Sequence, residues 1–331
     1  MVTFLARGKP STANAALLIM ILAAACWGLG TVLSKFTLEH IPPITLMVIE
    51  LSASCSLLWA MLIASGGHKG LRWKTIRRGW AGILEPGSAF ALCAVGLTMT
   101  SATNASLIGV TEPVIVVILA ACFLRERTSR RLLTFVGLAL AGTLFISGSE
   151  GGAGGTDTLM GNALVLGSAA CAALYTIVTR RAAQSVPPLT LAALQQSFGL
   201  AFVILLLPLE WVGNGGTAWA SVRAGFSLES LLWAALTGII GSGLAFLLYL
   251  SALRYVTATQ AALVMTAIPL FGVAGAVVLL GEVLTAVHIV GGGLIAAVLM
   301  RLRVEGHSPP PLAGERGLGG EGAEIRRNIY R

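Results

Sequence analysis

Three carboxylates stand inside long apolar stretches of the sequence, where a charged side chain needs a specific reason to occur. They are Glu50, Glu85 and Glu112. If these stretches cross a membrane, each charge costs at least about 2.5 kcal/mol on insertion scales, so its side chain should face protein or a wet cavity. Carboxylates in such places commonly belong to substrate or proton pathways. They are therefore the prime functional candidates.

Glu112 has the strongest claim of the three, because it stands near the middle of its apolar stretch and directly before Pro113. Proline has no N–H to donate, which leaves the carbonyl of Gly109 without its usual helical partner. Freed backbone groups of this kind commonly line binding cavities or form a hinge. For Glu112 we favour function over structure. For Pro113 and Pro269, a hinge and a plain structural kink are equally compatible with the sequence.

The other two acids have competing explanations. Glu85 stands near the start of its apolar stretch, within reach of Arg77 or Arg78, which favours a structural ion pair. Glu50 could extend toward the membrane surface, so a structural and a functional role are equally compatible with its position.

Aromatic and amide side chains within the apolar stretches form the second group of candidates. An aromatic set could line a cavity or clamp a cation, although core packing explains the same residues equally well. Amides could bind the carboxylate and ammonium of an amino acid or tie helices together, and we slightly favour the second role. The aromatic positions are Trp27, Tyr175 and Tyr249, and the amide positions are Asn104, Gln195, Gln196 and Gln260.

Signatures of enzymes, metals and cofactors do not occur in the sequence. The five cysteines all fall in apolar runs, without a CxxC pair or a Cys/His cluster of metal-ligand spacing. The glycines at 291–293 follow no strand and precede no lysine, so they predict helix contacts and not a phosphate loop. Neither an HExxH motif nor a convincing serine or cysteine nucleophile is found. The sequence therefore predicts no metal, no cofactor and no enzymatic activity.

The candidate residues must be positioned by membrane-spanning helices. Of 331 residues, 56% are hydrophobic and 11% charged, whereas soluble domains carry roughly a quarter charged residues. Runs such as residues 15–28 lack the alternating polarity of a β-barrel strand. An all-α membrane protein of about ten transmembrane helices is predicted. The spans lie near 15–35, 43–65, 80–100, 103–124, 132–148, 161–181, 188–209, 229–252, 258–280 and 285–303.

Positive charges support this set of spans. All arginines and lysines fall on one side of the predicted topology except Lys35 and Arg223. Because cytoplasmic loops retain Lys and Arg, both termini should be cytoplasmic, in a multi-pass protein of a bacterial inner membrane. The net charge of +8 follows from the same bias. The cations are dispersed over short loops, so no nucleic-acid partner is expected.

The two halves of the sequence resemble each other. A shift of 145 residues lays 25–46 over 170–191, and a shift of 156 lays 87–107 over 243–263. The same shifts pair Glu50 with Gln195, Asn104 with Gln260, Pro113 with Pro269 and Glu126 with Glu282, whereas Glu112 falls on Ile268.

Each half contains five predicted spans, an odd number, so the second half should be inverted in the membrane. Such inverted repeats are the structural basis of alternating access. The predicted organisation is a cytoplasmic N-terminus (1–14), a first five-helix repeat (15–148), an inverted second repeat (149–303) and a disordered cytoplasmic tail (304–331), which is rich in Gly, Pro and charge.

Several segments resemble the EamA family of the drug/metabolite transporter superfamily. They are Trp27–Gly28, the stretch 111–127, its counterpart 267–285 and the glycines at 291–293. In both halves a proline is followed thirteen positions later by a glutamate. The resemblance covers nearly the whole chain before the tail. It implies export of small metabolites through a central cavity, and the layout is similar to YddG-type amino-acid exporters.

The leading function hypothesis is export of small neutral or zwitterionic metabolites, foremost amino acids, by alternating access through a central cavity between the repeats. The alternative is a proton-coupled exporter of cationic or lipophilic drugs, with Glu112 or Glu50 exchanging protons for substrate. Phosphorylated substrates fit poorly, because every cation is predicted at a helix end or in a loop. An intramembrane enzyme is disfavoured. The expected partners are a small-molecule substrate, the lipid bilayer and protons, and a monomer should suffice.

Overall fold

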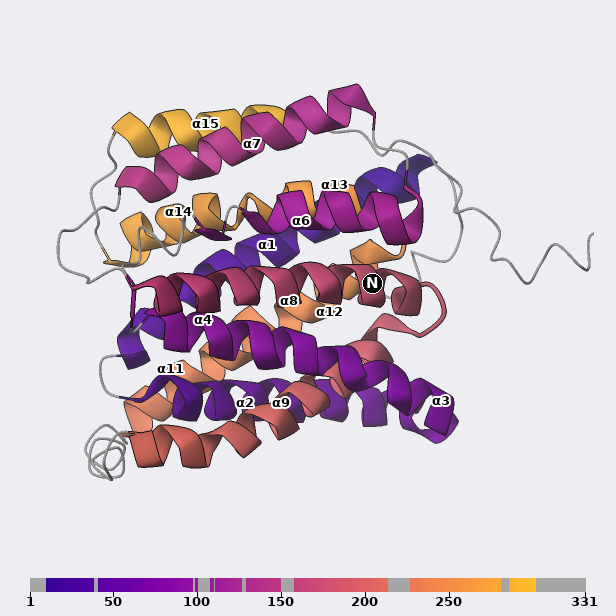
Figure 1. Cartoon of the computed structure of the whole chain (residues 1–331). Helices are drawn as coiled ribbons and strands as arrows, with labels where there is room; N and C mark the ends of the chain where they lie inside the picture. The colour runs from indigo at the N-terminus through magenta and orange to yellow at the C-terminus, as the bar shows by residue number, and fades with distance from the viewer. Residues whose placement is uncertain are drawn as a thin grey trace, which may run out of the picture.

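The computed structural model describes residues 10–38, 41–97, 99–100, 108–109, 111–126, 129–149, 158–213, 227–280 and 286–301. Every regular element within these ranges is helical, which confirms the all-α expectation. Most of the long helices lie side by side with their axes roughly parallel or antiparallel (Figure 1).

Six stretches of the described chain are long and apolar enough to cross a membrane. Two shorter apolar helices, Thr111–Leu124 and Ile289–Arg301, accompany them. The described residues thus show a helical protein with several membrane spans, and the number of ten spans stays a prediction. The six stretches are Asn14–Ser34, Pro43–Ala64, Leu159–Ala183, Pro188–Val212, Leu228–Leu253 and Ala258–Leu279.

The uninterrupted long helices are α1 (Pro10–Leu38), α2 (Pro43–Ala64), α7 (Arg130–Ser149), α8 (Leu159–Ala183), α9 (Pro188–Gly213) and α15 (Ala286–Arg301). Proline at a helix start explains two of their boundaries, since its missing N–H is not needed there. α2 begins at Pro43 and α9 at Pro188. The N-terminus of α8 is capped by Thr158, whose hydroxyl accepts a hydrogen bond from the Gly161 N–H at 3.0 Å.

The expected single span over 80–100 is broken into several pieces, which is a correction to the sequence expectation. The short helix α3 (Trp73–Ile76) and the 3₁₀ turn η3 (Arg77–Trp80) lead up to it, and its described part contains the π-helical η4 (Ile83–Ser88) and α4 (Ala89–Leu97). Glu85 within η4 has non-helical φ/ψ angles of −149° and 127°, and the peptide bond to Pro86 is cis. Proline disrupts the helical hydrogen bonds here, and π-helical turns occur frequently at functional sites.

Interrupted helices also occur elsewhere in the described chain. α11 (Leu228–Thr237) continues through π-helical η6 (Gly238–Leu244) into α12 (Ala245–Leu253), and α6 (Thr111–Leu119) ends in π-helical η5 (Ala120–Leu124). α13 (Ala258–Met265) is separated from α14 (Ile268–Leu280) by a two-residue turn. A short 3₁₀ helix, η2 (Gly67–Gly70), follows α2.

Helix contacts recur under the two sequence shifts. A shift of 156 takes α4 onto α12 residue for residue, and a shift of 145 takes much of α1 onto α8. α1 contacts α12 and α14, and α8 contacts the corresponding α4 and α6. α2 packs on its own counterpart α9, and α7 packs on its counterpart α15, a pair that lies along one edge in Figure 1. The internal resemblance of the sequence therefore has a matching pattern of contacts in space.

Two close backbone approaches obey the same correspondence. A Cβ atom added at Gly82 would overlap the carbonyl of Gln195, and one added at Gly238 would overlap the carbonyl of Glu50. Gly82 and Gly238 differ by 156 positions, and Glu50 and Gln195 by 145. Small residues let membrane helices approach closely. These glycines hold η4 against α9 and η6 against α2.

Substituting either glycine by alanine is expected to destabilise the protein by about 1–3 kcal/mol, because the added methyl group meets backbone and not a movable side chain. Thermal unfolding of the purified protein in detergent would measure the effect. Gly137→Ala is the matched control, since a Cβ at this position in α7 meets nothing within 4 Å. Equal unfolding temperatures for Gly82→Ala, Gly238→Ala and Gly137→Ala would contradict the assigned packing role.

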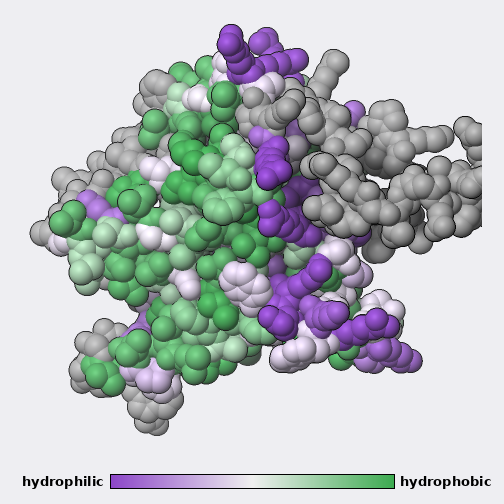
Figure 2. Space-filling view, turned by 45° about the vertical axis from the view of Figure 1, so that its right-hand side comes forward, coloured by the Kyte–Doolittle hydropathy of each residue, from purple (hydrophilic) through white to green (hydrophobic). Residues whose placement is uncertain are grey.

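The surface of the described chain is largely apolar over one broad region and hydrophilic toward one end (Figure 2). Large hydrophobic side chains are freely exposed, among them Leu205, Val212, Val278 and Met300. A soluble monomer rarely shows contiguous exposed apolar surface on this scale. Such a surface fits contact with lipid.

Candidate functional site

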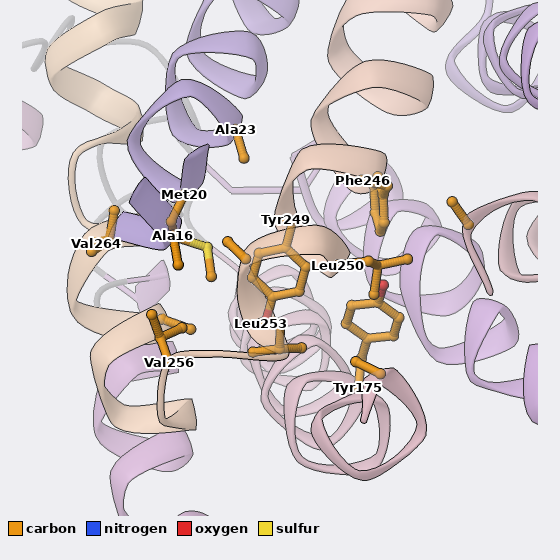
Figure 3. Packing of buried hydrophobic residues seen from close by; sticks show 14 of the residues in the cluster. Ala16, Met20, Ala23, Tyr175, Phe246, Tyr249, Leu250, Leu253, Val256 and Val264 are labelled. Carbon is orange, nitrogen blue, oxygen red and sulfur yellow. The ribbon is translucent and has the colours of Figure 1, made fainter. Parts of the chain in front are cut away.

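An aromatic cluster joins three helices in the interior of the described chain. The rings of Trp27 (α1) and Tyr249 (α12) have centroids 5.5 Å apart, and those of Tyr249 and Tyr175 (α8) lie stacked at 6.3 Å. Phe246 packs edge-on against both Trp27, at 5.0 Å, and Tyr175, at 5.9 Å. Tyr175, Phe246 and Tyr249 lie together in the close-up of the core (Figure 3). The structure thus brings together the three aromatic residues for which the sequence is equally compatible with cavity lining and with core packing.

Polar groups around this cluster connect α8 with α9 and α12. Tyr175 donates a hydrogen bond to Gln195 Oε1 at 2.9 Å, and Gln195 Nε2 donates to Thr179 Oγ1 at 3.1 Å. The hydroxyls of Tyr249 and Thr176 share a hydrogen bond of 2.9 Å. Gln195 therefore ties helices together, the role that we slightly favour from the sequence.

Trp27 and Gln196 have buried polar atoms without a hydrogen-bond partner among the described residues. These atoms are the indole Nε1 of Trp27 and the amide nitrogen and oxygen of Gln196. Unmet hydrogen-bonding capacity in the interior costs free energy unless a water or ligand satisfies it. These atoms are therefore available to a bound molecule.

Glu85 and Glu112 form an acid pair at the edge of the aromatic cluster. Glu85 lies in the kink of η4 and Glu112 in the first turn of α6, and both are partly buried. Their carboxyl groups interact electrostatically with each other. Both also interact with the hydroxyl of Tyr249, and Glu85 interacts with that of Tyr175. Two neighbouring carboxylates repel each other, so a cation or a proton between them is strongly favoured.

The expected ion pair between Glu85 and Arg77 or Arg78 is not present in the described part of the chain. Arg77 is exposed, and Arg78 donates a hydrogen bond to the hydroxyl of Ser185. Glu85 stands at the kink of η4, and its carboxyl group interacts electrostatically with Glu112 and with the Tyr175 hydroxyl. The partner of Glu85 is therefore another acid and not an arginine.

Glu50 lies apart from the acid pair, between α1, α2 and η6. Its Oε1 accepts a hydrogen bond from the Ser34 hydroxyl at 3.1 Å, and its backbone packs on Gly238. Its repeat counterpart Gln195 packs on Gly82 in the same way. The two residues occupy corresponding places but only Gln195 touches the aromatic cluster.

The other candidate residues that the structure describes occupy positions that a structural role explains. Gln260 belongs to the N-terminal capping box of α13, where its Oε1 accepts from the Thr257 N–H at 3.0 Å. Pro113 and Pro269 stand in the first turns of α6 and α14, positions in which proline is well tolerated. Asn104 lies outside the described residues. Within the described ranges, no three His, Cys, Asp or Glu side chains lie together in a group that could hold a metal ion.

Two long segments of the chain match one known family. The sequence profile of the EamA-like transporter family matches residues 14–148 and again residues 159–302. The chain belongs to the EamA-like transporter family. It is therefore a multi-pass membrane transporter and not an enzyme.

Individual relatives of this EamA-like transporter agree with the assignment. It is 26% identical to an uncharacterized transporter of Archaeoglobus fulgidus, an alignment that covers 84% of this chain and 95% of the relative. It is 25% identical to the uncharacterized transporter YetK of Bacillus subtilis, with 89% of each chain covered. A crystal structure matches with a TM-score of 0.67 at 18% identity, over 86% of this chain and 95% of the other, which shows a shared fold.

Three further charged residues of this EamA-like transporter have surroundings that the sequence does not predict. Glu210 and Glu126 each cap the N-terminus of a distant helix, α2 and α13 respectively. Arg180 is buried although it stands three residues before the end of α8. Of the three, only Glu126 stands out in the sequence, because the shift of 156 residues pairs it with another glutamate, Glu282. Arg180 was counted among the cations that flank cytoplasmic helix ends.

Proposed function

We propose that this EamA-like transporter exports small zwitterionic metabolites, foremost amino acids, by alternating access. The observation that carries the proposal is the acid pair Glu85 and Glu112 beside the aromatic residues Trp27, Tyr175 and Tyr249. The carboxylates would hold an ammonium group. The aromatic rings offer apolar and cation–π surface for the rest of the substrate.

The transport mechanism that we propose uses the two halves of the chain as an inverted pair of five-helix repeats, 15–148 and 149–303. Both termini, 1–14 and 304–331, would be cytoplasmic, and the chain would act as a monomer in a bacterial inner membrane. Support comes from the double family match and from the helix contacts that recur under the sequence shifts. Each half would then supply the same packing with opposite orientation, which permits two related access states.

Within this mechanism, Glu50, Gln195, Gln196 and Gln260 would line or brace the pathway between the halves. The turn before Pro269 and the start of α6 at Pro113 would act as hinges. Gln195 already ties α8 to α9 in the described arrangement, and Gln260 caps the start of its own helix, α13. Their proposed contribution is therefore to hold the site, whereas Gln196 has free amide atoms to offer a substrate.

Transport into proteoliposomes tests the proposed substrate class. The purified chain is expected to exchange radiolabelled neutral amino acids and to leave a cationic dye in place. Empty liposomes and liposomes with boiled protein serve as controls. Movement of the dye without movement of any amino acid would refute the proposal.

A second candidate function, proton-coupled export of cationic drugs, is favoured by the same acid pair, since a proton and an organic cation could compete for it. Dye efflux driven by an imposed pH gradient would identify this function. In that case Glu112→Gln should abolish the dependence of efflux on the gradient. Unchanged proton-coupled efflux in Glu112→Gln would remove Glu112 from that role.

A further inference from the structure

Arg180 is a buried cation that the acid pair and aromatic cluster do not explain. Its side chain is only 9% exposed, and its Nε and Nη1 atoms have no hydrogen-bond partner among the described residues. A guanidinium carries five N–H donors, and burying it with donors unmet is costly. An anionic group that enters the protein would satisfy it.

The acid that interacts electrostatically with Arg180 is already occupied. This acid is Glu126. Its carboxylate accepts hydrogen bonds from the N–H of Ala258 at 3.0 Å and from the N–H and hydroxyl of Thr259, both at 3.3 Å. Glu126 thereby caps α13, and the described ranges contain no direct ion pair between it and Arg180. Glu126 thus partly offsets the charge of Arg180, while the Nε and Nη1 atoms of Arg180 can still donate hydrogen bonds.

The position of Arg180 connects it to the proposed substrate site. Thr176 precedes it by one helical turn on the same face of α8. The Thr176 hydroxyl is hydrogen-bonded to that of Tyr249, and Tyr249 interacts electrostatically with Arg180 as well as with Glu85 and Glu112. One tyrosine hydroxyl therefore interacts electrostatically with two acidic groups and with a guanidinium. This arrangement is complementary to a molecule with an ammonium at one end and a carboxylate at the other.

We propose that Arg180 binds the carboxylate of the transported substrate. The inference rests on the proposed transport of zwitterions and assigns the anion-binding half of that site. A guanidinium can hold a carboxylate through two parallel hydrogen bonds, which a lysine ammonium does not reproduce. The substrate class is then amino acids with a free α-carboxylate, whereas their amides and the corresponding amines should be poor substrates.

Competition in proteoliposomes tests this assignment. Uptake of radiolabelled leucine is measured against unlabelled leucine and against leucinamide, which keeps the ammonium and side chain but lacks the carboxylate. The native chain should prefer leucine over leucinamide by about 10- to 100-fold, the usual scale for a buried hydrogen bond to a charged group. Arg180→Gln should lose this preference. Arg181→Gln is the matched control, because the adjacent Arg181 is exposed and donates to the carbonyl of Phe123.

The outcomes separate this inference from the proposed function. If the native chain moves leucine and Arg180→Gln keeps the native preference, the inference is wrong and the transport proposal stands. If Arg180→Gln lowers uptake of leucine and of labelled leucinamide equally, Arg180 is structural and the inference is again wrong. If the native chain moves no amino acid, the proposed function itself fails. Should Arg180→Gln fail to fold, Arg180→Lys decides, since it should keep transport but weaken the preference for leucine.

Discussion

Glu112→Gln is expected to lower amino-acid transport in proteoliposomes by about 10- to 100-fold, because a charge-assisted bond to the substrate ammonium is lost while side-chain size is kept. Glu85→Gln should have an effect of similar size, since the two carboxyl groups interact electrostatically. The double variant should be only slightly worse than either single one, because groups that act as a unit are not additive.

The control for these variants is Glu229→Gln, which changes the same charge at an exposed position in the first turn of α11. Initial rates are measured for equal amounts of reconstituted protein, with folding checked by size-exclusion chromatography. Additive losses in the double variant would show that Glu85 and Glu112 act independently. Native rates in Glu112→Gln would exclude the acid pair from substrate binding.

Glu210→Ala is expected to cause a large loss of stability, about 2–4 kcal/mol, because three hydrogen bonds to one carboxylate disappear and leave buried donors unmet. Glu210 at the end of α9 accepts from the N–H of Ile44 at 2.8 Å and from the N–H and hydroxyl of Thr45 at 3.0 and 2.8 Å. The contact fastens the start of α2 to α9, and the macrodipole of α2 adds to the attraction.

Thermal and denaturant unfolding in detergent would measure this loss. Glu229→Ala serves as the comparison, since Glu229 also stands near a helix N-terminus but its side chain is exposed. Glu210→Gln should fall between the native chain and Glu210→Ala, because its amide oxygen can still accept one or two of the bonds. A native unfolding midpoint for Glu210→Ala would mean that water replaces the carboxylate at no cost.

The two halves of the chain differ at the candidate site. The sequence shifts place Gly30 opposite Tyr175 and Gly241 opposite Glu85. Gly30 and Gly241 meet so closely that a Cβ on Gly30 would lie 2.8 Å from the Cα of Gly241. At the corresponding positions of the other half, a tyrosine and a carboxyl group interact instead. Two glycines thus pack closely at one of the two corresponding helix contacts. At the other contact, the equivalent positions hold two residues of the candidate site.

Several residues of the candidate site could be proposed from the sequence by reasoning about single residues. Glu112, Trp27, Tyr175 and Tyr249 were identified because charged and amphipathic side chains in apolar helices are costly or need partners. In the structure the three aromatic rings form one cluster, and Glu112 interacts electrostatically with the Tyr249 hydroxyl. For Glu85 the predicted partner differed from the one in the structure, because proximity along a helix says nothing about a kink that reorients the side chain.

Hydrophobicity and internal resemblance are enough to predict a helical membrane protein with two related halves, because both are sums over long stretches and tolerate local errors. Three features appear only in the folded chain: the electrostatic interaction of Glu85 with Glu112, the burial of Arg180 and the capping of α2 by Glu210. The interacting segments are far apart along the chain. The inward face of a helix is set by packing against segments far away in sequence, and the Glu210 contact joins residues 166 positions apart.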